Sequence, residues 1–132
     1  MIINQSAKLQ ALSYLVGNDT TVEALTLRLF SNNASISDTM TAADVTEVTT
    51  GEGYNSVVLT GSSWTISAVG TAPNAVYPIQ TWTFTAPKGN IYGYYVTNAS
   101  GTLLLAEKFS SGPYNVQTSG DTISVTLSIR LT

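Results

Sequence analysis

Residues that could carry out acid–base or nucleophilic chemistry are few in this chain. It contains no histidine and no cysteine among its 132 residues, and only 10% of them are charged. Without an imidazole or a thiol, an enzyme would have to work with carboxylates, lysine, tyrosine or serine. We therefore expect no catalytic residue, no metal ion and no cofactor, and a protein that is not an enzyme.

Glu107 is the carboxylate whose position most suggests chemistry. It shares its parity with Leu103, Leu105 and Phe109, which could place it on the buried face of a strand. A buried carboxyl group can act as a general acid, and a glycosidase would pair it with a second carboxylate across a groove. An ion pair, backbone amides at a strand end, or a bulge that turns the side chain outward explains the position without catalysis, and we favour these explanations.

Residues 31–53 form a polar stretch with four acidic residues and no basic one. The acidic residues are Asp38, Asp44, Glu47 and Glu52. They lack the close Asp-x-Asp-x-Asp-Gly spacing of a strong calcium site, so a solvated acidic loop is the expected structure. A loop of this length in a compact domain often contacts a partner. We therefore count Asp38 and Asp44 as candidate contact residues.

The tyrosines at positions 92, 94 and 95 are a second candidate site. Exposed aromatic side chains bind sugars, and they also form protein interfaces and ordinary cores. In a strand, Tyr92 and Tyr94 would share one face while Tyr95 points to the other. We expect at least one of the three to lie at a contact.

Strands must position these residues, because period-two alternation dominates the chain. From Thr122 to Thr132 the odd positions are apolar and the even ones are mostly hydroxylated, which predicts one half-buried strand. The other predicted strands are Leu25–Leu29, Tyr54–Thr60, Trp64–Val69, Ala75–Thr85, Ile91–Asn98, Leu103–Phe109 and a short segment at Tyr114–Val116, with a possible edge strand at Val45–Val48.

Their turns indicate how these strands connect. Gly61-Ser62-Ser63 should join the second and third strands as a hairpin, and a bulge is expected near Pro78. Seven or eight strands at this spacing predict an all-β fold, an antiparallel β-sandwich that is jelly-roll-like, with one short N-terminal helix.

The expected helix runs from Asn4 to Gly17. Asn4 or Ser6 would cap its start, and Gly17 would follow its end. Its apolar face comprises Leu9, Leu12 and Val16. A helix this short needs a surface to pack on, either the end of its own sandwich or a neighbouring subunit. We divide the chain into a helical arm, residues 1–20, and a sandwich domain, residues 21–132.

Charge and hydropathy bear on the kinds of partner. The net charge is −3 and the five basic residues are scattered, so we expect no nucleic acid to bind. No apolar run approaches the roughly 18 residues that a membrane helix needs, and the start of the chain does not resemble a signal peptide, so we expect no membrane contact. Serine and threonine make up about a quarter of the chain. Strand faces rich in hydroxyl groups suit contacts between neighbouring proteins without charge repulsion.

Several segments together resemble small accessory virion proteins of tailed bacteriophages. They are Leu25-Thr-Leu-Arg-Leu-Phe-Ser-Asn-Asn33, Glu47 ahead of Gly53-Tyr54, Leu59-Thr-Gly61 with Trp64-Thr65, Tyr92-Gly-Tyr-Tyr95, Phe109-Ser-Ser-Gly-Pro-Tyr-Asn115 and Gly120-Asp-Thr-Ile123. The similarity covers most of the chain after residue 20 and includes no catalytic motif.

The resemblance implies a place in the virion. Among such roles we favour a capsid cement, or decoration, protein that stabilises the shell by binding the major capsid protein or another virion protein, as a homo-oligomer with a trimer favoured. A tail or fibre module that binds host-surface glycans is the alternative. The predicted partner-contact residues are Leu9, Leu12, Val16, Asp38, Asp44, Tyr92, Tyr94 and Tyr95.

Overall fold

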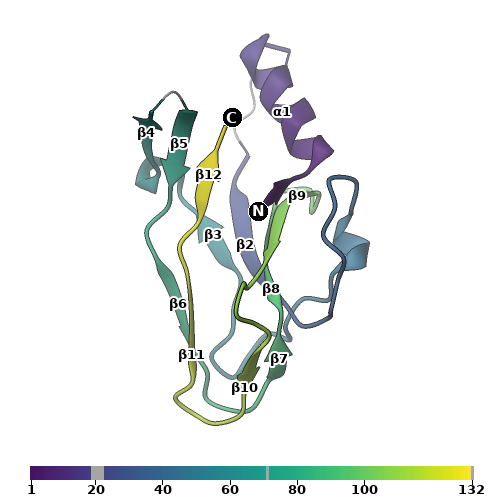
Figure 1. Ribbon diagram of the computed structural model, residues 1–132, viewed down its shortest axis with the longest axis vertical. Coiled ribbons are helices and arrows are strands. Elements are labelled where there is room, and N and C mark those ends of the chain that lie inside the picture. The colour runs from purple at the N-terminus through teal and green to yellow at the C-terminus, as the bar shows by residue number, and fades with distance from the viewer. Residues whose placement is uncertain (19–22, 71, 132) are drawn as a thin grey trace.

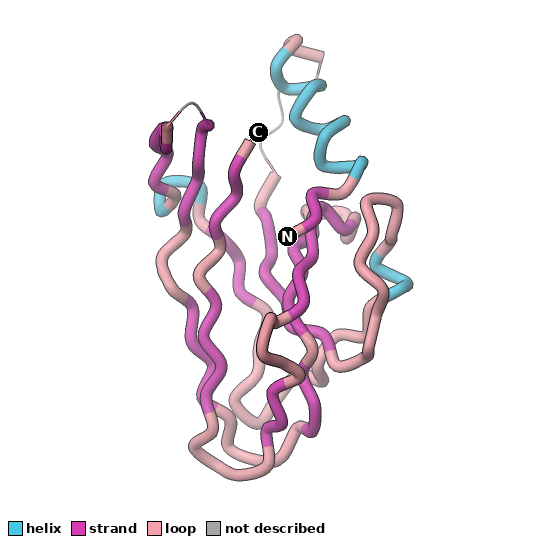
Figure 2. The backbone as a smooth tube through the Cα atoms, in the orientation of Figure 1, coloured by secondary structure: helices cyan, strands magenta, loops and turns pink. Residues whose placement is uncertain are grey.

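Antiparallel strands and a single α-helix make up the computed structural model, which describes residues 1–18, 23–70 and 72–131 (Figures 1 and 2). The predicted all-β class with one N-terminal helix is confirmed. The elements are β1 (Ile2–Ile3), α1 (Gln5–Leu15), β2 (Leu25–Phe30), β3 (Val57–Leu59), β4 (Thr65–Val69), β5 (Ala72–Val76), β6 (Gln80–Thr83), β7 (Gly89–Ile91), β8 (Gly93–Thr97), β9 (Leu103–Lys108), β10 (Tyr114–Val116), β11 (Thr122–Val125) and β12 (Ser128–Arg130), with short 3-10 helices at Ala42–Asp44 and Gly61–Ser63.

A five-stranded sheet, in the order β1-β9-β8-β2-β3, forms one side of the molecule. On the other side, β4, β5 and β12 form a three-stranded sheet, and β6 pairs with β11 beyond it (Figure 1). β10 pairs with β7 at the far end. Both sides contribute to one apolar core, which includes Leu27, Leu29, Tyr94, Val96, Leu105, Trp82, Ile123, Val125 and Leu127.

The last predicted strand is two strands in the structure. β11 pairs with β6, and β12 pairs with β5. The prediction of one unbroken strand is therefore wrong, although the alternation holds and Ile123, Val125 and Leu127 are buried. The interruption lies opposite the break between β5 and β6 at Tyr77–Ile79, where Pro78 has no N–H to donate to a ladder. The single strand Ala75–Thr85 with a bulge near Pro78 is therefore not found: the chain is interrupted at this proline, and β5 and β6 belong to different sheets.

The hairpin predicted across Gly61–Ser63 is wrong. β3 pairs with β2, while β4 pairs with β5, so the chain crosses here from one sheet to the other. Two contacts hold this crossing: Trp64 packs edge-on against Tyr77 with ring centroids 5.1 Å apart, and the Thr60 N–H donates to the Tyr77 hydroxyl at 2.9 Å. Small polar turn residues permit a reversal and a crossover equally, so their composition could not distinguish the two.

Residues 31–53 pack against the outer face of the five-stranded sheet. A second apolar cluster lies there and includes Phe30, Ala34, Met40, Val45, Tyr95, Leu103 and Ala106. No strand forms at Val45–Val48, because Glu47 makes only an isolated bridge to Phe30. The predicted edge strand is therefore wrong, and the loop is held by buried apolar side chains.

Helix α1 closely matches its predicted bounds. Asn4 caps it, since its Oδ1 accepts from the Ser6 N–H at 2.9 Å, and Gly17 follows its end with φ 73°. Asn4 is buried and also donates through Nδ2 to the Met40 carbonyl at 2.6 Å, so the start of the helix is tied to the loop. The predicted boundary between arm and sandwich, at residues 20 and 21, lies outside the described residues.

Candidate protein interface at the helical end

Helix α1 presents its apolar face to solvent. Leu9 is 62% exposed, Leu12 55%, Leu15 82% and Val16 68%, and no residue of the helix is buried. The three predicted contact residues of the helix are therefore available to a partner. Leu15, which the sequence analysis did not select, adjoins them.

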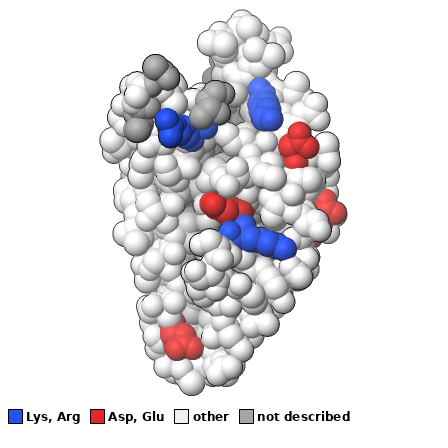
Figure 3. Space-filling model, in the orientation of Figure 1, with Lys and Arg blue, Asp and Glu red and all other residues white. Residues whose placement is uncertain are grey.

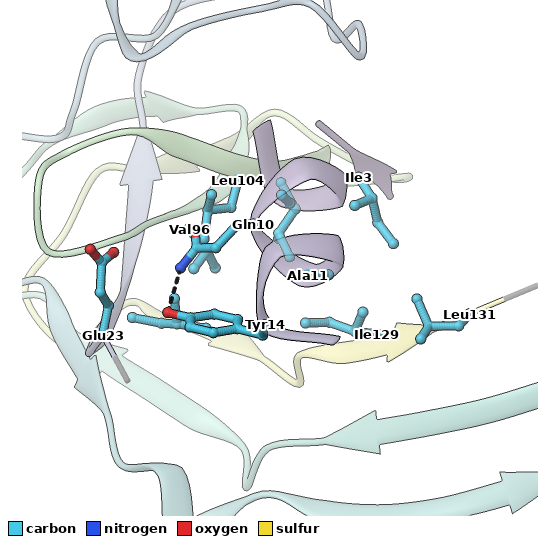
Figure 4. Close-up of a pocket in the computed structure, with 12 residues that line it drawn as sticks. Ile3, Gln10, Ala11, Tyr14, Glu23, Val96, Leu104, Ile129 and Leu131 are labelled. Carbon is cyan, nitrogen blue, oxygen red and sulfur yellow. Dashed lines mark hydrogen bonds between the residues drawn. The ribbon is translucent and has the colours of Figure 1, made fainter. Parts of the chain in front are cut away.

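The opposite face of α1 is turned toward the strands. It consists of small or polar residues, Ala7, Gln10, Ala11 and Tyr14, at the spacing of one helical face. Figure 4 shows Gln10, Ala11 and Tyr14 directed toward the core, with the Gln10 amide donating to the Tyr14 hydroxyl at 3.1 Å. The helix was expected to pack its apolar face either on the end of its own sandwich or on a neighbouring subunit. In the structure, the sandwich does not cover the leucine face.

The orientation of the helix follows from its attachment at the N-terminal side. β1 pairs with β9, the Asn4 N–H donates to the Leu104 carbonyl at 2.7 Å, and the Gln5 N–H donates to the Asp38 carbonyl at 2.9 Å. These backbone bonds fix the direction in which the helix leaves the sheet. The apolar residues at 9, 12 and 16 consequently point away from the molecule.

Further apolar side chains lie exposed at the same end. Ile66 of β4 and Leu131, which follows β12, are both exposed, and in Figure 1 α1, β4 and the end of β12 lie at the same end of the molecule. Val58 of β3 is exposed beside a hollow that also includes Glu23 and Leu25. We call this set the helical end: Leu9, Leu12, Leu15, Val16, Val58, Ile66 and Leu131.

The concentration of exposed apolar side chains at the helical end makes it the candidate contact surface. Most of the large apolar side chains that the described residues leave exposed come from it. Two exposed basic residues, Lys8 of α1 and Arg130 of β12, border these apolar side chains, and basic side chains are visible at this end of the molecule (Figure 3). Single exposed leucines are ordinary on soluble proteins, whereas a grouped set typically contacts another molecule.

The two predicted aspartates lie on the neighbouring loop. Asp38 is exposed, and its backbone carbonyl reaches the start of α1. The exposed Asp44 accepts from the Thr41 N–H at 2.8 Å and so caps the short helix at 42–44. The structure thus brings Asp38 beside the helix, while the carboxylate of Asp44 has a local structural partner. Among the described residues, no three acidic side chains gather as a metal site.

The three predicted tyrosines separate in the structure. Tyr94 is buried in the core between the sheets, and Tyr95 is buried beneath the 31–53 loop. Tyr92 is half-buried against the same cluster as Tyr95, because the chain breaks between β7 and β8 at this residue and the parity changes. The expectation that Tyr92 and Tyr94 share a face is therefore wrong, and Tyr94 and Tyr95 offer almost no surface to a partner.

An apolar cleft of about 440 Å³ opens beneath α1 (Figure 4). Its walls include Ile3, Leu25, Val96, Leu104, Ile129 and Leu131. A second hollow of about 380 Å³ shares Leu25, Ile129 and Leu131 with it and extends toward Trp64. The cleft therefore belongs to the helical end.

Glu23 is the acidic residue in the wall of this cleft. Its Oε2 atom is buried and has no hydrogen-bond partner among the described residues. Glu23 was missed by the sequence reasoning, because it precedes β2 and belongs to no periodic pattern. Exposed Ile66 and Leu131 were also missed, since their alternation with polar residues predicted burial.

A smaller, polar groove of about 230 Å³ lies elsewhere, beside β9 and β11. Tyr114 is partly exposed there and stacks on Phe109 with ring centroids 4.7 Å apart. Glu107 is half-exposed in this groove and accepts a hydrogen bond from the Tyr94 hydroxyl. Burial, and then Glu107, raises the pKa of Tyr94 above its usual value. Glu107 thus has an ordinary hydrogen-bond partner, together with an ion pair to the Met1 amine at 3.3 Å.

Comparison with known proteins gives no match: no family model, no curated protein and no solved structure is similar to this chain. Within the described residues, no helix is both long and apolar enough to cross a membrane.

Proposed function

We propose that this chain is a structural virion protein of a tailed phage, a cement protein that stabilises the capsid by binding subunits of the major capsid protein. The observation that carries the proposal is the exposed leucine face of α1 within the helical end. Protein interfaces bury an apolar centre of this kind inside a polar rim. The resemblance of sequence segments to accessory virion proteins gives the partner its class.

The proposal includes the finer architecture and the assembly. The antiparallel sheets would correspond to a jelly-roll-like sandwich, and the chain would assemble as a homo-oligomer, with a trimer favoured. A closed ring would repeat the helical end around its axis and give each α1 a defined position over a junction between capsid subunits. The hydroxyl-rich strand faces would contact their neighbours with little charge repulsion.

The proposed cement function requires no catalysed reaction. A cement protein acts by burying surface, so the proposal assigns no catalytic residue, metal or cofactor. Glu107 supports this view, because its hydrogen bond with Tyr94 accounts for its position in β9.

Co-sedimentation with purified particles tests the proposal. The protein would be mixed with phage shells that lack it, and a Leu9→Ser, Leu12→Ser double variant would be compared with the unchanged chain. We expect a loss of binding of about a hundredfold, because two central apolar contacts are removed from an interface. Deletion of residues 1–16 should have at least the same effect.

Ile79→Ser is the matched control, because Ile79 is 61% exposed, like Leu9, but lies between β5 and β6 outside the helical end. Its binding should equal that of the unchanged chain. Full decoration of shells by the double variant would contradict the proposed interface. Cryo-electron microscopy of decorated particles would also show whether the protein lies on the shell or on the tail.

A tail or fibre module that binds host glycans is the second candidate. The observation that favours it is Tyr114, whose ring lies partly exposed in a polar groove with Glu107 and Ser124. A sugar ring can stack on an aromatic face while neighbouring carboxylate and hydroxyl groups bind its hydroxyls. A glycan array separates the two functions: reproducible binding that Tyr114→Ala abolishes favours the module, and a cement protein gives none.

A further inference from the structure

The cleft beneath α1 combines an apolar wall with one unsatisfied acceptor. Ile3 of β1, Leu104 of β9 and Ile129 of β12 line it, and Val96 and Leu105 carry the apolar surface down to the core. The Oε2 atom of Glu23 is buried at this cleft, and no residue of the described ranges donates a hydrogen bond to it. Buried acceptors are nearly always satisfied in folded proteins, so this oxygen indicates a missing donor.

Charge complementarity identifies that donor. A carboxylate in an apolar wall is matched best by a cationic nitrogen, which forms a charge-assisted hydrogen bond. The volume of about 440 Å³ is within the range of sites that hold a ligand, and the adjoining hollow past Ile129 and Leu131 lengthens it. Two adjoining apolar hollows that share Leu25, Ile129 and Leu131 suit an extended segment of chain that runs from one into the other.

Continuity with the helical end identifies the source. Leu131 belongs both to the exposed surface and to the cleft wall, so a protein seated on the helical end would reach the cleft directly. We propose that the cleft receives an extended, apolar segment of the partner protein, and that a lysine of this segment pairs with Glu23. This inference rests on the proposed function, since it names a feature of the same partner.

Peptide binding to the isolated protein tests the proposal. The probe is a seven-residue peptide with blocked ends, valine alternating with serine, in which lysine replaces one valine. Calorimetry should show saturable binding, and a peptide with norleucine in place of lysine should bind about tenfold more weakly, as loss of one charge-assisted bond predicts. In Glu23→Gln this preference for lysine should largely disappear.

Two tryptophan variants localise the binding. Ala11→Trp fills the cleft from the inward face of α1 and should abolish binding, whereas Ala43→Trp, at an exposed alanine of the 42–44 helix, should leave it unchanged. Thermal unfolding of each variant verifies that it is folded. Should Ala11→Trp be unfolded, chemical-shift changes of the cleft residues in the unchanged protein locate the peptide instead.

Several results would overturn the inference. These are no saturable binding of the lysine peptide, binding that survives in folded Ala11→Trp, and an unchanged preference for lysine in Glu23→Gln. Saturation by dodecylammonium without peptide binding would assign the cleft to a small amphiphile. A dimer that dissociates in Ala11→Trp would assign it to a second copy of the chain. Co-sedimentation of the leucine variants with particles tests the proposed function, and peptide binding tests the cleft. Either assay can fail while the other succeeds, so the two proposals remain distinguishable.

Discussion

Arg28 and Glu47 form an ion pair that fastens the 31–53 loop to the five-stranded sheet. The Arg28 Nη1 atom lies 2.9 and 3.1 Å from the two carboxylate oxygens of Glu47. The Tyr54 hydroxyl donates to Glu47 Oε1 at 2.9 Å and accepts from the Leu29 N–H at 3.1 Å. One acidic residue of a loop that looked solvated therefore organises a polar network beside the core.

Tyr54→Phe should destabilise the protein, because it removes the hydroxyl that accepts from the Leu29 N–H and leaves this buried donor unpaired. We expect the free energy of unfolding to fall by about 1–3 kcal/mol. Urea denaturation of the variant and of the unchanged protein measures this difference in the free energy of unfolding. Tyr114→Phe, at a partly exposed ring, is the control and should change stability little. Equal effects in the two variants would show that the network contributes nothing measurable.

Stability should decline at alkaline pH. Burial raises the pKa of Tyr95 to about 12, and raises the pKa of Tyr54 and of Tyr94 as well. A tyrosine with a raised folded-state pKa stabilises the protein fully below its unfolded value of about 10, and this contribution is lost as the pH rises through the folded value. The Thr60 N–H lowers the pKa of Tyr77, and this opposite shift offsets a part of the stability that is lost at alkaline pH.

Denaturation series at increasing pH measure this decline, with tyrosinate absorbance recorded in parallel. The free energy of unfolding should be level near neutral pH and fall above pH about 10. Full ionisation of all seven tyrosines at about that pH while the protein stays folded would contradict the burial of these rings.

Gly93→Ala should disrupt the sheet. A Cβ at this position would lie 2.1 Å from the Glu107 carbonyl oxygen and 2.8 Å from the Lys108 Cα atom. Backbone atoms of β9 cannot move aside without breaking the β8–β9 pairing, so we expect a loss of about 3 kcal/mol or more. Gly61→Ala meets no atom within 4 Å and is the control in the same denaturation assay. Near-native stability of Gly93→Ala would mean that β8 and β9 are farther apart.

Asn4→Ala should loosen α1. It removes the helix cap and also leaves the Met40 carbonyl without its donor, so we expect a cost of about 1–2 kcal/mol. Amide hydrogen exchange should quicken through α1 and around residue 40, while β2 and β8 keep their protection. Asn115→Ala, at an exposed residue of β10, should change neither region. Unaltered exchange in α1 would show that the cap does not hold the helix.

Local patterns predicted much of the secondary structure. The alternation of Leu25, Leu27 and Leu29 predicted β2, and the asparagine and glycine at the two ends of α1 marked the helix. These features depend on residues that are close in sequence, so they can be predicted from one amino-acid sequence. Pro78 marked an irregularity for the same reason, since proline has no N–H to donate, but a bulge was predicted where the structure has a break between two strands.

Relations between distant segments were not predictable. The crossover at Gly61–Ser63 depends on whether β3 finds β2 or β4, which no turn residue specifies. The direction of the leucine face of α1 depends on bonds from Asn4 to Met40 and Leu104, far along the chain. Glu23 became a candidate only once folding placed it in the cleft wall.

The aliphatic character of the exposed leucine face of α1 has a practical consequence for recovering the protein from any assembly it joins. Contacts between aliphatic groups strengthen in sulfate and are not weakened by electrostatic screening. High chloride would therefore leave the leucine contacts of such a complex intact and weaken only an ion pair such as the one proposed for Glu23. Ammonium sulfate would tighten the leucine contacts, and a mild non-ionic detergent would release the bound chain.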